Sequence, residues 1–310
     1  MERFTTPIPR PSLVLRSRTP FFLSRPPRVY PVARPQNFSF HLKERRRSRI
    51  SMSLSGSSPA AIGTSHDVGV KGSSSSVVGE KDLLIVGPGV LGRMVAEKWR
   101  QENPGCQIFG QTMTTDHHDE LVEVGIVPSL AGTKAAHQFP YVIFCAPASQ
   151  TADYPGDVSP VVPIGASPRM DVLLKAENAA LDAGGCVLRL AGLYKVDRGA
   201  HVYWLEKGSV DARPDHILNL IHYEDAASLS IAIMQNKFWG RIFVGCDNHP
   251  LSRQEIMDFV NQSGKFNKKF QGFTGTDGPL GKRMNNSRTR AEIGWEPKYA
   301  SFLDFLRQID

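Results

Sequence analysis

The sequence predicts an α/β protein with a doubly wound parallel sheet and a smaller C-terminal substrate lobe. Two observations lead to this prediction. Residues 83–92 form an apolar run that ends in a glycine-rich turn and leads into a helix-forming segment. Beyond the turn, short apolar runs alternate with amphipathic segments as far as residue 190. Such alternation is typical of a parallel sheet with helices on both faces.

The glycine-rich turn is the most informative segment. Leu83 to Val86 supply the continuous apolar run that a buried parallel strand needs. Gly87 permits a tight bend, Gly89 leaves room for a pyrophosphate to approach the backbone, and Gly92 lets helix and strand pack closely. The positive end of the following helix favours an anion. We therefore predict a Rossmann-like dinucleotide site made of Gly87, Gly89, Val90, Leu91, Gly92 and Arg93. The alternative is a glycine turn that binds nothing.

The other elements follow in order along the chain. Strands are predicted at 107–111, 126–127, 141–146, 186–190 and 241–245, with an extended segment at 219–222. Helices are predicted at 91–103, 116–124, 171–183, 225–234, 287–293 and 302–307, with a helix or half-turn at 133–138. Ser252 and Glu255 form a capping box that opens one more helix, through Val260. We assign 81–195 to a dinucleotide-binding domain and 196–310 to a C-terminal lobe interleaved with late sheet strands.

The N-terminal part of the chain differs in composition. The first fifty residues contain 12 Lys and Arg and only 2 acidic residues, a net charge of +10, whereas the rest of the chain carries −3. Arginine, proline and serine without periodicity are typical of an organelle transit peptide. We predict a chloroplast transit peptide at 1–52 and a disordered Ser/Gly-rich linker at 53–80, and thus a protein of the stroma. The alternative is a disordered basic arm.

Several classes of function are disfavoured by composition. Because the excess positive charge belongs to the tail, we expect no nucleic-acid partner. No apolar stretch is long enough to span a membrane, so we expect no membrane insertion. The four cysteines are widely spaced and lack histidines at ligand spacing, so we expect neither a metal site nor a disulfide framework.

Four motifs together resemble the extended and atypical short-chain dehydrogenases/reductases, the group that contains nucleotide-sugar epimerases and dehydratases. They are the glycine turn and the segments 188–194 (LRLAGLY), 219–225 (NLIHYED) and 282–297, which ends AEIGWEP. The likeness covers roughly residues 82–305 and is greatest to plant chloroplast members. It implies a nicotinamide dinucleotide, a small-molecule substrate, and a cofactor contact at Ala146 and Pro147.

Catalysis in that family depends on a Tyr-x-x-x-Lys pair on one helix and a Ser or Thr at the end of the preceding strand. In this sequence Lys175 takes the position of the family's lysine, where it would also contact the cofactor, but Asp171 stands where the tyrosine would be. We name Lys175 and Asp171 as the candidate catalytic residues. The alternative is that Asp171 complements the helix dipole and that Lys175 is its solvated partner.

A second departure concerns the sheet itself. Between the strand ending at Ala146 and the helix near Asp171, the family has a crossover helix and a strand that carries the active-site hydroxyl. Here the intervening segment, residues 147–170, contains five prolines, which disfavour both a regular helix and a central strand. We therefore expect one central strand to be missing, and we interpret the chain as a shortened form whose junction lies near Val158 and Ser159.

The identity of the cofactor is left open between NADP and NAD. NAD-preferring folds place an acid at the end of the second strand, but here that strand runs into Thr112 with no acid before Asp116. Arg93 could meet a 2′-phosphate, so NADP is slightly favoured; the alternative is that Arg93 is an ordinary exposed residue. Two functions follow. One is oxidoreductase or epimerase-like chemistry, and the other is a non-catalytic NAD(P)-binding sensor or scaffold.

Overall fold

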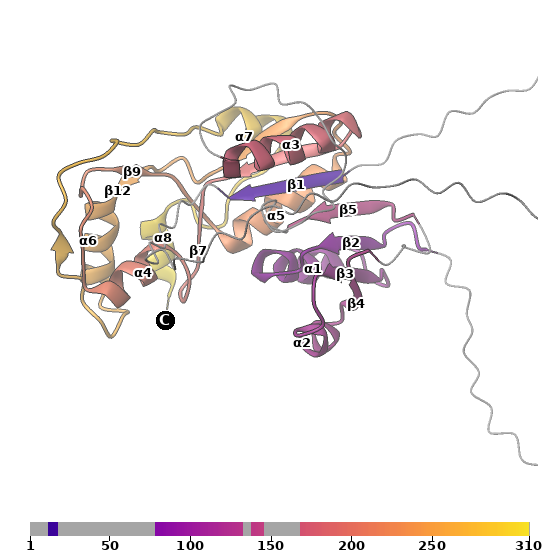
Figure 1. Cartoon of the computed structure of the whole chain (residues 1–310), viewed down its shortest axis with the longest axis horizontal. Coiled ribbons are helices and arrows are strands. Elements are labelled where there is room, and N and C mark those ends of the chain that lie inside the picture. The colour runs from indigo at the N-terminus through magenta and orange to yellow at the C-terminus, as the bar shows by residue number, and fades with distance from the viewer. Residues whose placement is uncertain (1–11, 18–77, 133–137, 146–167, 310) are drawn as a thin grey trace, which may run out of the picture. The chain divides into compact units, whose positions relative to one another are not determined.

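The fold is seen in a computed structural model, which describes residues 12–17, 78–132, 138–145 and 168–309 (Figure 1). Several predictions concern residues outside these ranges. They are the half-turn at 133–137, the contact at Ala146 and Pro147, most of the linker, and the junction near Val158 and Ser159.

A seven-stranded parallel sheet forms the centre of the fold. Its order is β11-β6-β1-β5-β2-β3-β4. In sequence order the strands are β1 (Ser12–Ser17), β2 (Leu83–Val86), β3 (Ile108–Thr112), β4 (Val127–Leu130), β5 (Tyr141–Phe144), β6 (Cys186–Leu190) and β11 (Ile242–Gly245). The chain runs from β2 to β3 and β4 in one direction and then returns to β5 on the other side of β2. This reversal confirms the predicted doubly wound α/β fold.

β1 is the strand that the sequence did not indicate. We expected a central strand to be missing between those now identified as β5 and β6, and the structure places Ser12–Ser17 at that position, in parallel pairing with both neighbours. The segment lies inside the predicted transit peptide. It escaped prediction because a three-residue apolar run, Leu13 to Leu15, followed by Arg16 carries no signal of the partner strands on either side of it.

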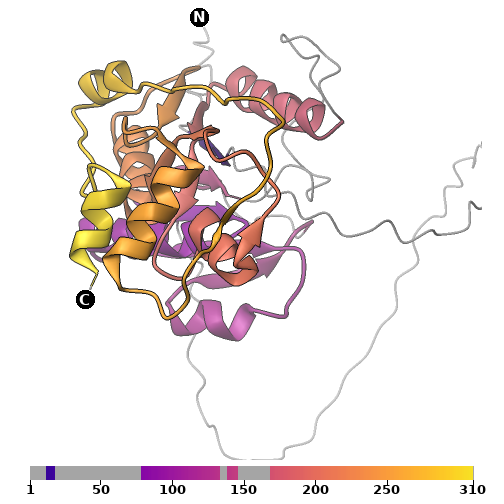
Figure 2. The same cartoon turned by 90° about the vertical axis from the view of Figure 1, so that its left-hand side faces the viewer.

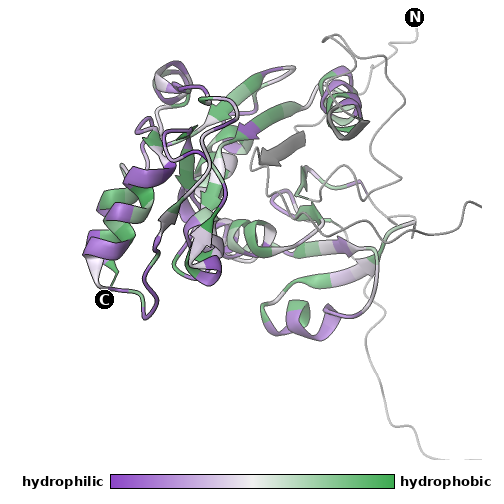
Figure 3. Cartoon of the chain, turned by 60° about the vertical axis from the view of Figure 1, so that its left-hand side comes forward, coloured by the Kyte–Doolittle hydropathy of each residue, from purple (hydrophilic) through white to green (hydrophobic). Residues whose placement is uncertain are grey.

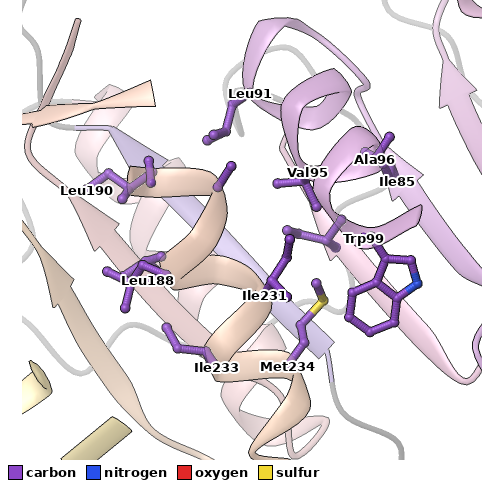
Figure 4. Close-up of a cluster of buried hydrophobic side chains, with 14 of the residues drawn as sticks. Ile85, Leu91, Val95, Ala96, Trp99, Leu188, Leu190, Ile231, Ile233 and Met234 are labelled. Atoms are coloured by element: carbon purple, nitrogen blue, oxygen red, sulfur yellow. The ribbon is translucent and has the colours of Figure 1, made fainter. Parts of the chain in front are cut away.

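Helices cover both faces of this sheet. Because the connections β2–β3 and β5–β6 run in opposite directions, right-handed crossovers place α1 (Val90–Glu102) and α3 (Pro168–Asp182) on opposite faces. α1 packs against α5 (Tyr223–Gln235) through Leu91, Val95 and Trp99, which meet Ile231 and Met234 (Figure 4). Figure 3 shows hydrophobic residues along the strands and mixed polarity on the outer helices. The four-residue spacing on α1 therefore marks its buried face, as predicted.

A second hydrophobic core lies beside the sheet, where the lobe elements gather (Figure 2). It contains Tyr194, Trp204, Ile256, Phe302 and Phe305, all buried. The surrounding elements are β7 (Gly192–Tyr194), α4 (Ala200–Lys207), β8 (Ser209–Val210), β9 (Ile217–Leu218), β10 (Leu220–His222), β12 (Leu251–Ser252), α6 (Arg253–Ser263), β13 (Gly272–Phe273) and α8 (Phe302–Gln308). The remaining helices are α2 (His118–Glu123) and α7 (Ser287–Ile293).

Local signals predicted most of these elements. The capping box is present, since Ser252 and Glu255 exchange backbone hydrogen bonds at the start of α6. Several boundaries shift by a few residues and β7, β8, β9, β12 and β13 were not predicted, but two differences have a clear physical reason. α3 begins at Pro168, within the segment where prolines were expected to prevent a helix, because proline is tolerated in the first turn. α4 was not predicted: it begins after Gly199 and holds Trp204 and Leu205 in the lobe core.

Two buried carboxyl groups give this fold an expected pH dependence. Burial raises the pKa of Asp247 to about 7 and that of Asp225 to about 6. Asp225 accepts hydrogen bonds from the Lys298 and Tyr299 amides. Asp247 has one oxygen bonded to the His249 amide, but its second oxygen has no partner among the described residues. Of the two, Asp247 therefore benefits more from being protonated.

We expect Asp247→Asn to stabilise the protein at pH 8 and to change little at pH 4. The folded state binds this proton more tightly than the unfolded state, so the stabilisation is complete below about pH 4 and is lost as the pH rises through 7. The difference in unfolding free energy should reach the order of 3 kcal/mol at pH 8. Urea unfolding of both proteins at several pH values measures it. A difference that stays constant with pH would contradict the assignment. Buried His201 and His222, whose pKa values fall to about 4, act in the opposite sense but are common to both proteins.

Candidate functional site

A cavity lies where the carboxyl ends of β2, β3 and β5 meet, at the point where the strand order reverses. In doubly wound sheets this crevice is where ligands bind. Its volume is about 600 Å³. The lining residues are Gly87, Pro88, Gly89, Val90, Arg93, Thr112, Met113, Thr114, His117, Glu120, Leu121, Cys145 and Arg198. Of the predicted cofactor residues, Gly87, Gly89, Val90, Arg93 and Thr112 therefore lie together.

Each of the three glycines in the turn is required, or allowed, at its position for a different structural reason. Gly87 has φ 77°, a backbone conformation that residues with a side chain rarely adopt. A Cβ atom on Gly92 would lie 3.0 Å from the Ile85 side chain and 3.4 Å from the Gly87 carbonyl oxygen, so this glycine lets α1 approach β2. Gly89 differs from both, because its φ is −73° and, beyond its chain neighbours and its own helix, no atom of the described residues lies within 4 Å of where its Cβ would be.

The space beside Gly89 suits an anionic ligand. Gly89 caps a 13-residue helix whose first turn contains no acidic residue and whose N-terminal amides have no helical partner. Partial positive charge at this helix end attracts a phosphate. The residues present therefore fit the pyrophosphate of a dinucleotide. Leu91 and Gly92, also predicted as binding residues, are buried beneath the turn and do not line the cavity.

Three side chains that can carry charge, those of Arg93, His117 and Glu120, form part of the cavity lining and contact one another. Arg93 forms an ion pair with Glu120, with 2.9 Å between Nη2 and Oε2. Nδ1 of His117 lies 3.0 Å from Oε1 of the same carboxylate. The hydrogen bond from His117 and the contact with Arg93 hold the pKa of Glu120 below its usual value. Arg93 is thus a member of a charged cluster that connects α1 to the start of α2.

The histidines of this region have partners that the sequence did not reveal. From the sequence, neither His117 nor His118 had a plausible orienting partner. In the structure His117 contacts Glu120, and Nε2 of His118 lies 2.7 Å from the Thr112 hydroxyl oxygen. The i, i+3 spacing of His117 and Glu120 is a local signal that could have indicated the first pair. His222 has a structural role: it caps α5 by accepting a hydrogen bond from the Glu224 amide.

Two lining residues come from distant parts of the chain. Arg198 belongs to the turn between β7 and α4, more than one hundred residues after the glycine turn, and brings a guanidinium to the cavity. Cys145 follows β5, and burial raises its thiol pKa to about 12, so it remains a neutral thiol. Arg198 could not be assigned from the sequence, because no local motif connects it to the glycine turn.

The candidate catalytic residues lie elsewhere. Lys175 and Asp171 are on α3, and neither is among the described residues that line the cavity. Lys175 is exposed. One carboxylate oxygen of Asp171 is buried, with no hydrogen-bond partner among the described residues. The structure therefore does not bring this pair to the glycine turn.

The three later motifs do meet, around a second and smaller cavity. The side chain of Asn219 connects them. Its Nδ2 donates a hydrogen bond to the Lys282 carbonyl oxygen, and its Oδ1 accepts one from the Met284 backbone amide, both at 2.7 Å. Its own carbonyl accepts from the Gly192 amide at 2.9 Å. The cavity has a volume of about 230 Å³. It is lined by Ala191, Gly192, Leu193, Ala200, His216, Ile217, Leu218, Asn219, Leu220, Gly281, Lys282 and Met284.

Two further features are absent from the described part of the chain. No group of three or more His, Cys, Asp or Glu side chains is arranged to hold a metal ion. No helix there has the length and apolar character required to cross a bilayer.

Comparison with known proteins gives matches at the level of structure. No family model and no curated protein matches the chain. A functionally unknown conserved protein from Silicibacter pomeroyi is 19% identical, with a TM-score of 0.58 over 73% of this chain and 96% of that one. The dTDP-glucose 4,6-dehydratase of Bacillus anthracis, solved with NAD, is 13% identical, with a TM-score of 0.56 over 73% and 95%.

A third match is the Bordetella bronchiseptica enzyme WbmF in complex with NADH, 13% identical, with a TM-score of 0.58 over 74% of this chain and 91% of that one. At such identities the likeness concerns the fold. The chain thus has the Rossmann-like fold that is also found in NAD-bound dehydratases and epimerases.

Proposed function

We propose that this protein binds a nicotinamide dinucleotide at the cavity beside the glycine turn. The observation that carries the proposal is the open space at Gly89, at the N-terminus of a helix without acidic residues in its first turn. The pyrophosphate would accept hydrogen bonds from the first-turn amides of α1. Arg198 would pair with a phosphate oxygen from the opposite side, since its guanidinium lines the same cavity.

We propose further that the substrate is a small molecule, bound in the cavity around Asn219 and next to the segments that carry the family resemblance. When bound, the nicotinamide would supply hydride transfer, the basis of oxidoreductase and epimerase-like reactions. The solved dehydratase and WbmF structures contain NAD and NADH, which supports a nicotinamide cofactor for this fold.

The second candidate function is a sensor or scaffold that binds the cofactor without turnover. One observation favours it. Lys175 is exposed on α3, and no tyrosine is among the described residues that line the larger cavity. A protein with this arrangement can hold the dinucleotide, but none of its described residues brings a tyrosine to the cavity to act as an acid or base.

Binding and turnover, measured on the same sample, separate these functions. Titration of the purified full chain with NADH and NADPH, followed by nicotinamide fluorescence and by calorimetry, should give a saturable signal with both. Oxidation across a panel of sugar nucleotides and small carbonyl compounds should then be compared with that of Lys175→Ala. Turnover that depends on Lys175 supports the enzyme. Binding with background turnover supports the sensor. Absence of binding by the folded chain would rule out both.

Arg93 and Glu120 should determine the relative affinity of the protein for NADPH and NADH. We propose a slight preference for NADP, because Arg93 can exchange Glu120 for a 2′-phosphate. Arg93→Ala should weaken NADPH binding about tenfold while changing NADH binding much less, as expected for losing one charge-assisted contact. Glu120→Gln should shift the ratio of the two dissociation constants in the opposite direction. The same fluorescence titrations measure both ratios, and two variants with unchanged ratios would show that this pair plays no part in specificity.

We also propose that residues 1–52 direct the protein to the chloroplast stroma. The support is compositional: many arginines and prolines, few acids, and serine enrichment just beyond. Fused to a fluorescent protein, residues 1–80 should be imported by isolated chloroplasts and become resistant to external protease. A matched fusion in which Arg45, Arg46, Arg47 and Arg49 are replaced by glutamate should remain outside. Equal exclusion of both fusions would overturn the assignment.

A further inference from the structure

The position between β5 and β6 is occupied by a strand from a remote part of the chain. Ser12, Leu13 and Val14 pair with Val142, Ile143 and Phe144 on one side of β1. On the other side, Leu13 through Ser17 pair with Cys186 through Leu190. Both ladders are parallel, and β5 and β6 are not paired with each other. Residues 12–17 are therefore a central strand, bonded along both edges (Figure 1).

Without β1, two buried strands would lose their partners. Neighbouring strands lie about 4.8 Å apart, so β5 and β6 are separated by the width of one strand. Ile143, Val187 and Leu188 on these strands are fully buried. Backbone N–H and C=O groups left unpaired in such surroundings are costly, on the order of 1–3 kcal/mol each. The gap therefore has a strong preference for a strand.

The connection to β1 differs from the other connections in the sheet. β2 and β3 are joined through α1, a packed crossover that holds both strands in place. By contrast, residues 18–77, sixty in number, separate β1 from the next described residues. A connection of this length contributes little to holding its end in place, because the effective concentration of a tethered segment falls with tether length. The ladders themselves must provide the attachment.

We propose that the gap between β5 and β6 is a strand-acceptor site and that its occupant is this chain's own Ser12–Ser17, bound as a peptide would be. The N-terminal segment is then part of the folded protein, so if residues 1–52 direct import as proposed above, Ser12–Ser17 must stay with the protein after import. Such strand addition is a known mode of peptide recognition, in which main-chain hydrogen bonds supply the affinity. The inference is independent of dinucleotide binding, because it concerns the sheet and not the glycine turn.

Cutting the connection after folding tests this directly. A site-specific protease sequence placed at residues 60–66 of the full chain allows cleavage of the folded protein. The N-terminal fragment should co-elute with the rest in gel filtration and separate from it only in denaturant. Elution of the fragment on its own under native conditions would overturn the proposal. Elution of a dimer in which each copy supplies its N-terminal fragment to the other would also contradict the proposal, because the strand would then come from a second copy.

The variant Val14→Pro should weaken binding of the N-terminal fragment in the same cleavage experiment. Val14 pairs with both Phe144 and Val187, and proline in a central strand removes a ladder hydrogen bond. After cleavage we expect the affinity of this fragment to fall at least about tenfold, a loss of roughly 1.4 kcal/mol or more. Val32→Pro makes the same substitution outside β1 and should leave retention unchanged. Equal retention of the two variants would refute the role of the strand.

A second measurement keeps the test decisive if Val14→Pro does not fold. A labelled synthetic peptide of residues 9–20, added in excess to the cleaved wild-type complex, should exchange with the bound fragment. The same peptide with proline at position 14 should not compete. Two results would show that the gap is not a strand-acceptor site. One is that both peptides are incorporated to the same extent. The other is that neither peptide is incorporated over several days even though the original fragment dissociates.

Discussion

Replacing Gly89 with valine should abolish dinucleotide binding while leaving the fold intact. The backbone at Gly89 has φ −73° and ψ −158°, an extended conformation that a β-branched residue can adopt, and no other atom of the described residues would meet the new Cβ within 4 Å. The added side chain would stand in the cavity, between a phosphate and the first-turn amides of α1. We expect affinity for NADH and NADPH to fall at least about 100-fold, a loss of roughly 3 kcal/mol.

The neighbouring glycine provides the contrasting control. A Cβ at Gly92 would lie 3.0 Å from Ile85 and 3.4 Å from a backbone oxygen, so Gly92→Val should overpack the contact between α1 and β2. Its expected cost is about 1–3 kcal/mol of stability. Fluorescence titration with thermal unfolding of both variants separates the two effects. If Gly89→Val binds either dinucleotide as tightly as the unmodified protein, the cofactor does not use this helix terminus.

Replacing Arg189 with alanine should cause the largest loss of stability. Arg189 on β6 donates two hydrogen bonds from Nε, at 3.2 and 3.3 Å, and one from Nη2, at 2.7 Å, to the carboxylate of Glu177 on α3. The Glu177 side chain is only 3% exposed, against 25% for Arg189. Removing the guanidinium takes these charge-assisted hydrogen bonds away from a buried carboxylate, so we expect a loss of about 3 kcal/mol in urea unfolding.

The double variant Arg189→Met with Glu177→Leu is the matching control. Because both charges are then replaced by apolar side chains, its stability should lie within about 2 kcal/mol of the unmodified protein, or above it. Together with the single variants Arg189→Met and Glu177→Leu, the double variant completes a double-mutant cycle, which gives the coupling between the partners. A coupling near zero would show that the pair is solvated in solution and contributes no stability.

The sequence predicted the glycine turn because its information is local. A buried strand, a turn that requires a positive φ, and an amphipathic helix follow one another within twenty residues, and each is encoded by its own composition. The capping box at Ser252 is encoded in the same way. The prediction covered the backbone that forms the candidate phosphate site, together with Arg93 and Thr112, because these residues belong to the same βαβ unit.

Residues that reach the cavity from elsewhere escaped prediction. Arg198 and Glu120 line it only because chain crossovers bring their elements to the same edge of the sheet. The candidate pair of Asp171 and Lys175, by contrast, was chosen for its spacing along one helix, and neither residue is among the described residues that line the cavity. Their four-residue spacing places them near each other on α3, but spacing along a helix says nothing about which face of the sheet the helix covers.

By itself, the sequence determined the doubly wound class, the glycine turn and the buried face of α1, because each depends on residues close together in the chain. Only the tertiary structure decided which strand completes the sheet and which charges surround the cavity. Strand pairing is specified by backbone hydrogen bonds, which are the same for almost every residue type. A short apolar run such as Ser12–Ser17 therefore reveals its place only when β5 and β6 stand on either side of it.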